Sequence, residues 1–523
     1  MSARFKTFPE LKNEQAQASD PAVHAALSAS AGTGKTQVLT ARVLRLLLKG
    51  ARPESILCLT FTKAAAAEMA NRIGERLAKW VRLKRTELWN DLEALGEQPN
   101  ERLIERARQL FAKVLDCPGG LKIQTIHSFA QSLLAAFPAE AGVVPGFQPI
   151  EGRAEQELVR RTLAELMADA EANGDTALIG DVQCLSRRLG ETGAVEYLQA
   201  CARRPEALTA FGQREAIEPA IRQLMNLPDG SADEYIATQC GEGFDCDLLR
   251  AVAEANRKWG GKTGLGFAST IEDWLELTPI ERAAALPDLA GIVCTAKGER
   301  KQVQKGQANA DPEYDRHAGR LANLIGELLH VQNGGRLAAD MAAGLRAGQA
   351  FAAAYIQAKR AAGVADFNDL IEWTRQLLKQ PGMGDWVRYK LDRQVDHVLV
   401  DEAQDTNAAQ WEIIEQLVNE FFSGSSEVEK RVRTLFMVGD FKQAIYGFQG
   451  TDPERFRLAR EMFKRRAEAL STGEDLFSYQ RRAQEFRDLS IAASFRSAQP
   501  VLDVVDAVIQ TVGPAALGLT EPP

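Results

Sequence analysis

The chain has 523 residues, of which 45% are hydrophobic and 26% are charged, and its formal net charge is −8. These values are typical of a globular protein with more than one domain. The seven cysteines include no C-x-x-C pair, which disfavours a zinc site or a disulfide framework. The N-terminus lacks the apolar core of a signal peptide, and no apolar run is long enough to predict a membrane span. We therefore expect a cytoplasmic protein without a membrane partner, whose acidic balance still permits a local basic groove for nucleic acid.

A glycine-containing loop follows the first predicted strand, His24 to Leu27, and precedes a predicted helix. The loop reads ASAGTGKT and departs from the usual G-x-x-x-x-G-K-[ST] pattern at its first position. Glycine lets backbone N–H groups surround phosphate oxygens, Lys35 can reach the β- and γ-phosphates, and the Thr36 hydroxyl can bind Mg²⁺. The candidate phosphate-binding residues are Ala29, Ser30, Ala31, Gly32, Thr33, Gly34, Lys35 and Thr36. This order predicts a nucleoside triphosphate site, the alternative being a glycine turn before an ordinary helix.

Two further strands are predicted in the first 150 residues, at 55–62 and 122–127. Open α/β sheets bind ligands at the carboxyl ends of their strands. A hydroxyl there can contact a phosphodiester oxygen, and an aromatic ring can stack on a base. The strand-end residues that could contact a nucleic acid are Thr60, Phe61, Thr62 and His127. Core packing is an equal alternative for Phe61, and a structural hydrogen bond is the more common role of a single histidine.

The middle of the chain interrupts this alternation of strands and helices. Residues 151–360 are rich in Ala, Leu, Arg and Glu at helical spacing, whereas strands are again predicted at 395–400 and 434–439. We therefore predict an α/β fold, a parallel sheet flanked by helices, with a large inserted helical domain. A smaller helical excursion is predicted at about 80–118.

Asp401 and Glu402 directly follow the predicted strand at 395–400. An aspartate at a strand end beside a phosphate loop suits Mg²⁺, and an adjacent glutamate can orient and deprotonate an attacking water. Two adjacent acids are more often part of a solvated loop. The pattern therefore predicts a hydrolysis site on the condition that this element meets the loop at 29–36 in space.

The remaining candidate residues lie further along the chain. The loop after the strand at 434–439 carries Gln443, which could contact the γ-phosphate, and Tyr446 and Phe448, which could stack on bases. Arg496 follows another apolar run and could contact a nucleotide phosphate, a surface arginine being the alternative.

The ordered motifs resemble those of the UvrD/Rep/PcrA-like superfamily 1 DNA helicases. They are Gln15, then ASAGTGKT, LTFTKAAAAEM, TIHSF, DEAQD, GDFKQAIYGFQG and SFRS, and they cover about 11–150 and 361–505. Within that superfamily the chain most resembles the AddA-type helicase–nuclease subunit of alphaproteobacteria. The additional cues are the residues at 137–142 and 366–371.

The resemblance implies a RecA-like P-loop ATPase that uses ATP and Mg²⁺. It implies that Gln15 reads the adenine edge, that Asp401 holds the metal and that Glu402 is the general base. Gln443 and Arg496 would contact the γ-phosphate, and the residues facing single-stranded DNA would be Phe61, His127, Tyr446 and Phe448. Phe448 stands where several relatives carry Trp, and Gln449 stands where many carry Arg.

The resemblance also implies a division into domains and a cellular task. Residues 1–150 and 361–485 would form domain 1A, 151–360 the inserted domain 1B, and 486–523 the start of a second RecA-like domain, 2A. We expect an ATP-dependent 3′→5′ DNA helicase that processes double-strand-break ends with an AddB-type partner. Because nothing after residue 500 resembles the later helicase motifs or a nuclease, we expect a truncated form. The alternatives are a stand-alone UvrD-like repair helicase and an inert fragment or assembly subunit that binds DNA and ATP.

Overall fold

The structure is a computed structural model that describes residues 7–29, 32–241, 243–422, 431–440, 443, 453–472, 484–491 and 498–513. The chain forms two compact units. The first comprises Met1–Ile150 together with Gly363–Pro523, and the second comprises Glu151–Ala362.

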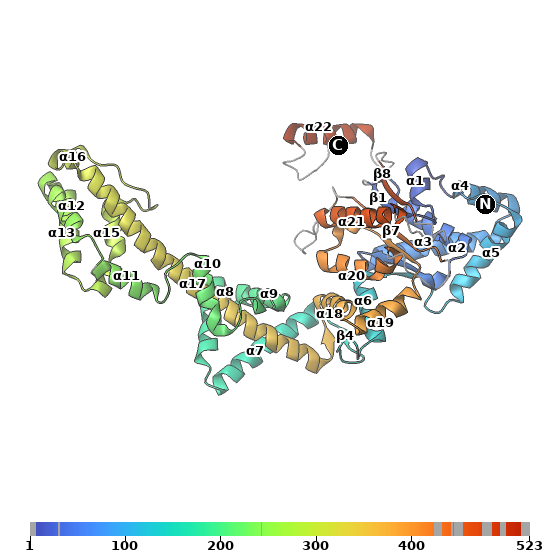
Figure 1. Ribbon diagram of the computed structural model, residues 1–523, viewed down its shortest axis with the longest axis horizontal. Coiled ribbons are helices and arrows are strands. Elements are labelled where there is room, and N and C mark those ends of the chain that lie inside the picture. Colours follow the sequence, from blue (N-terminus) through green and yellow to red (C-terminus); the bar gives the residue numbers. More distant parts are fainter. Residues whose placement is uncertain are drawn as a thin grey trace. The chain divides into compact units, whose positions relative to one another are not determined.

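The first unit is built on a sheet of six parallel strands (Figure 1). The strand order is β3-β2-β6-β7-β1-β8. The strands are β1 (His24–Ala29), β2 (Ile56–Thr60), β3 (Lys122–Thr125), β6 (His397–Val400), β7 (Thr434–Gly439) and β8 (Phe486–Ile491). Because all pairings are parallel, the carboxyl ends of the strands lie at one edge of the sheet, where open α/β sheets bind ligands.

Both faces of this sheet are buried, which explains why its strands are apolar without strict alternation. On one face Ala26, Val398 and Met437 pack against α6 (Ile126–Ala136), α18 (Phe367–Lys379), α20 (Ala408–Val418) and α21 (Pro453–Thr472). On the other face Leu27, Leu399 and Val438 pack against α1 (Asn13–Ala18), α2 (Lys35–Lys49), α3 (Lys63–Arg82), α4 (Arg85–Ala94) and α5 (Glu101–Leu115). Successive residues of each strand therefore contribute to two different cores.

The predicted strands at 24–27, 55–62, 122–127, 395–400 and 434–439 all have observed counterparts, the last with the same bounds. The helical excursion at about 80–118 corresponds to α4 and α5. The expectation that a second domain begins at residue 486 is wrong for β8. This strand pairs in parallel with β1 and so completes the sheet of the first unit, because its backbone groups hydrogen-bond to the exposed edge of β1.

The second unit is helical, apart from an isolated bridge between Cys294 and Arg300 in the part that the structure describes. Its longest element is α17 (Tyr314–Ala362) with 49 residues. Small residues let α17 approach α8 closely, because a Cβ on Gly348 would lie 2.6 Å from Sγ of Cys201. The other helices are α7 (Arg153–Ala172), α8 (Thr176–Ala202), α9 (Pro205–Thr209), α10 (Ile217–Leu224), α11 (Ala232–Gly241), α12 (Cys246–Trp259), α13 (Gly261–Glu276), α14 (Pro279–Ala284), α15 (Leu286–Val293) and α16 (Lys305–Ala310).

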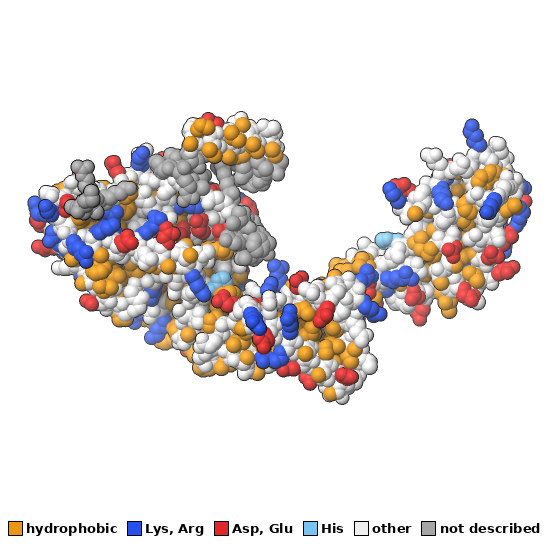
Figure 2. Space-filling model, turned by 180° about the vertical axis from the view of Figure 1, so that it is seen from behind, with side chains coloured by type: hydrophobic (Ala, Val, Ile, Leu, Met, Phe, Trp, Pro, Cys, Tyr) orange, Lys and Arg blue, Asp and Glu red, His pale blue; other side chains and the backbone are white. Residues whose placement is uncertain are grey.

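The surface carries charges of both signs. Figure 2 shows Lys and Arg side chains interspersed with Asp and Glu on the visible face of each unit. Hydrophobic side chains gather over α22 (Gln499–Val512), where Val501 and Val504 are 55% and 64% exposed (Figure 2). None of the described helices combines the length and the apolar character that crossing a bilayer requires.

A buried arginine on α2 joins the helix α1 to the first strand. Arg42 is fully buried and donates hydrogen bonds to the carbonyl oxygens of Ala18, at 2.7 Å, and Val23. Its guanidinium lies 5.0 Å from the ring centroid of Phe436 on β7. Burial lowers the pKa of Arg42 to about 9. The turn that leads from α1 into β1 is therefore held by a side chain of the helix that follows β1.

We expect Arg42→Met to lower the free energy of unfolding of the first unit by about 2–4 kcal/mol, because two buried carbonyl groups lose their donor. Chemical denaturation followed by tryptophan fluorescence measures this change. The control is Arg52→Met, since the Arg52 side chain is 50% exposed and surface substitutions usually change stability by less than about 0.5 kcal/mol. Equal effects of the two variants would contradict the structural role of Arg42.

Candidate functional site

The loop between β1 and α2 has the backbone geometry of an anion-binding turn. Gly32 and Gly34 have φ angles of 78° and 89°, in the left-handed region that favours glycine. The helix α2 begins at Lys35, and no side-chain hydrogen bond caps its N-terminus among the described residues. An N-terminus without such a cap presents backbone N–H groups and a positive dipole end, both of which favour a phosphate. Ser30 and Ala31 lie outside the described residues.

Gln15 on α1 is fixed against this loop. Its side chain is almost fully buried, and Nε2 donates to the carbonyl oxygen of Thr33 at 2.9 Å. Its Oε1 accepts from the backbone N–H of Lys12 at 3.1 Å. A Cβ on Gly34 would lie 3.0 Å from Nε2 of Gln15, so the loop and the amide are in close contact. The structure thus brings Gln15 to the loop, and its contact with adenine stays a prediction.

The acidic element after β6 meets the loop. Nζ of Lys35 lies 3.0 Å from Oε2 of Glu402, although the two residues are 367 positions apart. The Glu402 backbone has φ 48° and ψ 48°. Left-handed geometry in a residue other than glycine costs about 1–3 kcal/mol and concentrates at functional sites. The condition set by the sequence for a hydrolysis site, that the two elements meet, is fulfilled by this ion pair.

Two further carboxyl groups lie next to Glu402 in the acidic element, Asp401, which is half-buried, and Asp405, which is buried. Burial, and then the neighbouring Glu402, raises the pKa of Asp401 to about 7. The same two causes, in the same order, raise the pKa of Asp405 to about 6. Lys35 opposes both shifts without cancelling them. The site therefore holds more carboxyl groups than one lysine can neutralise, and a bound cation would favour their ionised forms.

A second glutamine, Gln404, connects Glu402 to the end of β7. Its Nε2 donates to Oε2 of Glu402 at 2.8 Å, and its Oε1 accepts from the backbone N–H of Asp440 at 2.9 Å. The side chain of Gln443 in turn donates to Oδ2 of Asp440. The sequence pattern DEAQD contains Gln404 but gave it no role. Its position between the ends of β6 and β7 in the fold is what indicates a role for Gln404.

The strand-end residues of β2 are less accessible than predicted. Thr60 is 1% exposed and its hydroxyl donates to the carbonyl oxygen of Thr62 at 3.1 Å. A direct contact of the Thr60 side chain with DNA is therefore not supported. The Thr62 hydroxyl accepts from the backbone N–H of Ala65 at 3.1 Å and caps α3. Phe61 is half-buried, so both of its alternatives, core packing and base stacking, are still open.

His127 lies at the start of α6, directly after β3. Burial lowers the pKa of His127, so its ring is neutral at physiological pH. The ring packs edge-on against Phe367, with centroids 5.0 Å apart. Phe367 is 37% exposed at the start of α18. Sequence reasoning cited the segment around Phe367 as a cue but missed this aromatic neighbour of His127, because only the fold brings them together.

The remaining predicted residues, Tyr446, Phe448 and Arg496, lie outside the part of the chain that the structure describes, as does Gln449. Among the described residues, no group of three or more His, Cys, Asp and Glu side chains has the arrangement of a metal site.

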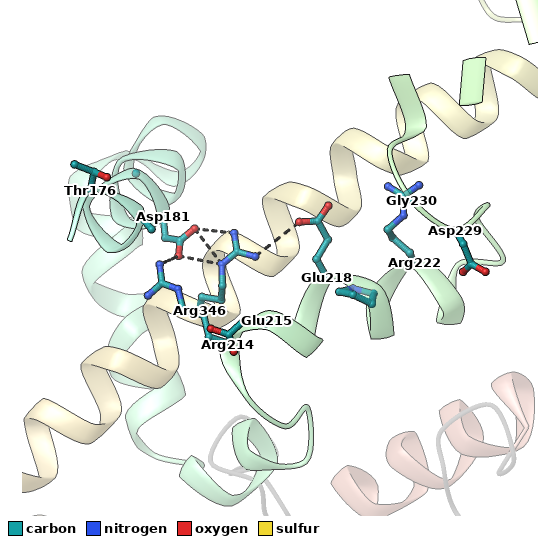
Figure 3. Close-up of a pocket in the computed structure, with 12 residues that line it drawn as sticks. Thr176, Asp181, Arg214, Glu215, Glu218, Arg222, Asp229, Gly230 and Arg346 are labelled. Atoms are coloured by element: carbon teal, nitrogen blue, oxygen red, sulfur yellow. Dashed lines mark hydrogen bonds and ion pairs between the residues drawn. The ribbon is translucent and has the colours of Figure 1, made fainter. Parts of the chain in front are cut away.

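A separate cavity of about 650 Å³ lies in the second unit (Figure 3). Asp181 accepts from Arg346 at 2.8 Å and from Arg214 at 2.7 Å, and Glu218 lies 3.8 Å from Arg346. None of the residues predicted from the sequence lines this cavity. Its arginines and carboxylates largely pair with one another, so it has no clear charge preference for a ligand.

We expect the stability effect of Asp401→Asn to depend on pH. An unfolded aspartate titrates near pH 4, whereas the folded pKa is about 7. The ionised carboxylate therefore costs stability above pH 7, and this cost falls as the pH falls toward 4. In ligand-free protein, Asp401→Asn should raise the free energy of unfolding by more at about pH 8 than at about pH 5, by on the order of 1–3 kcal/mol.

Denaturation at the two pH values measures this difference. The control is Asp247→Asn, because the Asp247 side chain is 93% exposed and its removal should have nearly equal effects at both pH values. A pH-independent effect of Asp401→Asn would contradict the assigned burial cost.

Comparisons with known proteins point to one family. Residues 11–464 match the family described as UvrD/REP helicase N-terminal domain. A protein from Pelotomaculum thermopropionicum, named as a subunit of an ATP-dependent helicase/nuclease, is 28% identical over 541 aligned positions, covering 94% of this chain and 38% of that protein. Proteins of the same name from Desulforudis audaxviator and Listeria monocytogenes are 29% and 25% identical, covering 94% and 92% of this chain. These two alignments cover 39% and 38% of the relatives, so the chain spans less than half of their length.

The match extends over most of the chain and includes the loop at 29–36, the acidic element at 401–405 and the strands that carry them. The parallel sheet and the contact between Lys35 and Glu402 agree with it. The chain belongs to the UvrD/REP helicase N-terminal domain family.

Proposed function

We propose that this chain carries the ATP-hydrolysing site of an ATP-dependent 3′→5′ DNA helicase. The observation that carries the proposal is the 3.0 Å contact between Lys35 of the glycine loop and Glu402 of the acidic element. A glycine turn before an ordinary helix would not require a carboxylate 367 positions away to meet its lysine. Under this proposal the first unit is a RecA-like P-loop domain, 1A, and the second unit is an inserted helical domain, 1B.

The residues present fit ATP and Mg²⁺. Lys35 and the backbone N–H groups at the start of α2 would bind the phosphates, and Gln15 would contact the adenine. Thr36 and Asp401 would hold Mg²⁺, because Asp401 is a buried carboxyl group beside a second carboxylate and a cation would favour its ionised form. When bound, the metal ion neutralises charge on the phosphoryl oxygens.

The side chains themselves suggest how hydrolysis proceeds. Lys35 pairs with Glu402 in this structure, and a triphosphate would offer it a more highly charged partner. Glu402 would then be free to orient the attacking water and accept its proton, the role of a general base. Gln443, which extends from the end of β7, would contact the γ-phosphate, and Arg496 would complete the set of phosphate contacts.

Single-stranded DNA would bind at the same edge of the sheet. Phe61 and His127 follow β2 and β3, the two strands that lie beyond β6 on the side away from β7. Aromatic rings there can stack on bases without sequence preference. Under this proposal Tyr446 and Phe448 extend the DNA contact, Thr62 contributes through its backbone position, and cycles of ATP binding and release shift these contacts along one strand.

The biological task is proposed from the resemblance and the relatives. The relatives are named as one subunit of an ATP-dependent helicase/nuclease. We propose an AddA-type protein, of the alphaproteobacterial form that the motif residues resemble, which processes double-strand-break ends with an AddB-type partner. The competing functions are a stand-alone repair helicase and an assembly subunit that binds DNA and ATP. Only the assembly subunit would bind ATP without hydrolysing it, so a measurement of ATP hydrolysis separates it from the two helicases.

The first experiment measures ATP hydrolysis by this chain with and without single-stranded DNA. We expect DNA-stimulated turnover, and we expect Glu402→Gln to lower kcat by about 10²–10⁴-fold, the usual contribution of a positioned general base. The control is Glu93→Gln, an exposed carboxylate near the end of α4. Nucleotide and DNA binding without turnover would favour the assembly role, and the absence of nucleotide binding would overturn the proposal.

A second experiment separates the two roles left open for Phe61. If Phe61 stacks on a base, Phe61→Ala should raise the Kd for a fluorescent oligo-dT by about 5- to 100-fold, equivalent to about 1–3 kcal/mol. Fluorescence anisotropy measures the affinity. Trp386→Ala is the control, because Trp386 is an exposed aromatic residue that stacks on Tyr389 of its own helix, α19 (Met383–Asp392). A lower melting temperature with unchanged Kd would assign Phe61 to the core.

A further inference from the structure

Gln404 occupies the space between the acidic element and the end of β7. It lies in the 3₁₀ turn Ala403–Asp405 that follows β6 and is 1% exposed. Its amide makes two strong hydrogen bonds, from Nε2 to Oε2 of Glu402 at 2.8 Å and to Oε1 from the backbone N–H of Asp440 at 2.9 Å. A longer contact of 3.3 Å joins Nε2 to Oδ2 of Asp405. Every polar atom of this buried side chain therefore has a partner.

The orientation of the amide is determined by chemistry. A backbone N–H can only donate, so the atom facing Asp440 must be the carbonyl oxygen of the amide, and the NH₂ group must face Glu402. Gly439 also permits the short distance between the Gln404 amide and the end of β7. A Cβ at that position would lie 2.7 Å from Oε1 of Gln404 and 3.2 Å from its backbone nitrogen, so glycine is needed for this close approach.

Two donors share one oxygen of Glu402. Oε2 accepts from Nζ of Lys35 at 3.0 Å and from Nε2 of Gln404 at 2.8 Å. Under the proposed function Lys35 turns to the phosphates of ATP, and Gln404 is then the donor that still holds the carboxylate. The strained backbone of Glu402, with φ 48°, needs such a restraint to stay in place.

We propose that Gln404 is a positioning residue that aims the carboxylate of Glu402 and ties it to the end of β7, from which Gln443 extends. This inference rests on the proposed function of the site. Gln404 does not touch the substrate itself. Its effect on turnover is transmitted through Glu402, and the alternative is a merely structural role in joining β6 to β7.

The experiment compares kcat and KM for ATP in wild type, Gln404→Met and Gln404→Glu. Methionine keeps the approximate shape and removes both hydrogen bonds, whereas glutamate keeps the shape and replaces the donor with an oxygen. We expect both variants to lower kcat by about 10- to 100-fold, part of the contribution of the base. We expect KM to change by less than about twofold, because the lost interaction orients the base rather than binds the nucleotide.

A double-mutant cycle distinguishes positioning from structure. If Gln404 acts through Glu402, adding Gln404→Met to Glu402→Gln should lower the residual rate by less than about twofold. Gln410→Met is the matched control, because Gln410 is also a buried glutamine with a hydrogen bond from a backbone N–H, that of Asn407 at 3.0 Å. Gln410→Met should lower the melting temperature about as much as Gln404→Met and leave kcat within about twofold.

Failure of this inference and failure of the proposed function give different results. If the wild type is active and both Gln404 variants keep its kcat, the inference is overturned and the proposed function stands. The same holds if Gln404→Met lowers kcat as much in the Glu402→Gln background as in the wild type. It also holds if Gln410→Met lowers kcat as much as Gln404→Met does. A wild type that binds ATP and DNA without hydrolysis would overturn the proposed function and this inference with it.

Discussion

The parallel direction of the six strands is the constraint on which the site depends. It places the ends of β1, β6 and β7 at one edge, so the loop at 29–36 and the acids at 401–402 can meet although they are far apart in the chain. Because β7 lies between β1 and β6, Asp440, which directly follows β7, ends at the same edge of the sheet as the loop and the acidic element. Gln404 links the end of β6 to the end of β7, and an antiparallel arrangement of any of the three strands would remove one partner.

The same edge concentrates charge that the fold alone does not neutralise. Asp401 and Asp405 have raised pKa values because they are buried beside Glu402, and Lys35 is the cation that opposes both shifts. The left-handed backbone of Glu402 adds local strain. Elsewhere in the first unit a buried charge is held by neutral groups, since Arg42 donates to the carbonyl oxygens of Ala18 and Val23. Functional sites often lower the stability of the folded protein locally, and the packing of the core compensates for that loss. The carboxyl groups at 401–405 are an example, because their charge favours a bound cation.

Local patterns allowed much of this site to be predicted, and long-range contacts explain what was missed. The strands before Asp401 and Gln443 contain short apolar runs, at 398–400 and 435–438, and the glycine loop has a defined spacing, so each piece could be located from neighbouring residues. The pairing of β8 with β1 depends on an edge 460 or more positions earlier and has no local signal. Thr60 resembled a surface hydroxyl because sequence does not reveal that it bonds to the next turn. Gln404 and Phe367 gain their roles only from neighbours that the fold supplies.

The insertion of the second unit leaves the sheet intact because its two ends lie side by side. The strands β4 (Gln148–Pro149) and β5 (Val364–Ala365) pair in parallel, with Gln148 opposite Val364. The chain therefore leaves the first unit at Ile150 and returns at Gly363 next to the point of departure. The closure entropy of an inserted segment rises only slowly with its length, so a segment with its own helical core can be accommodated at this point. The elements that carry Lys35, Asp401 and Gln443 consequently form one sheet, although the insertion separates the first of them from the other two in the sequence.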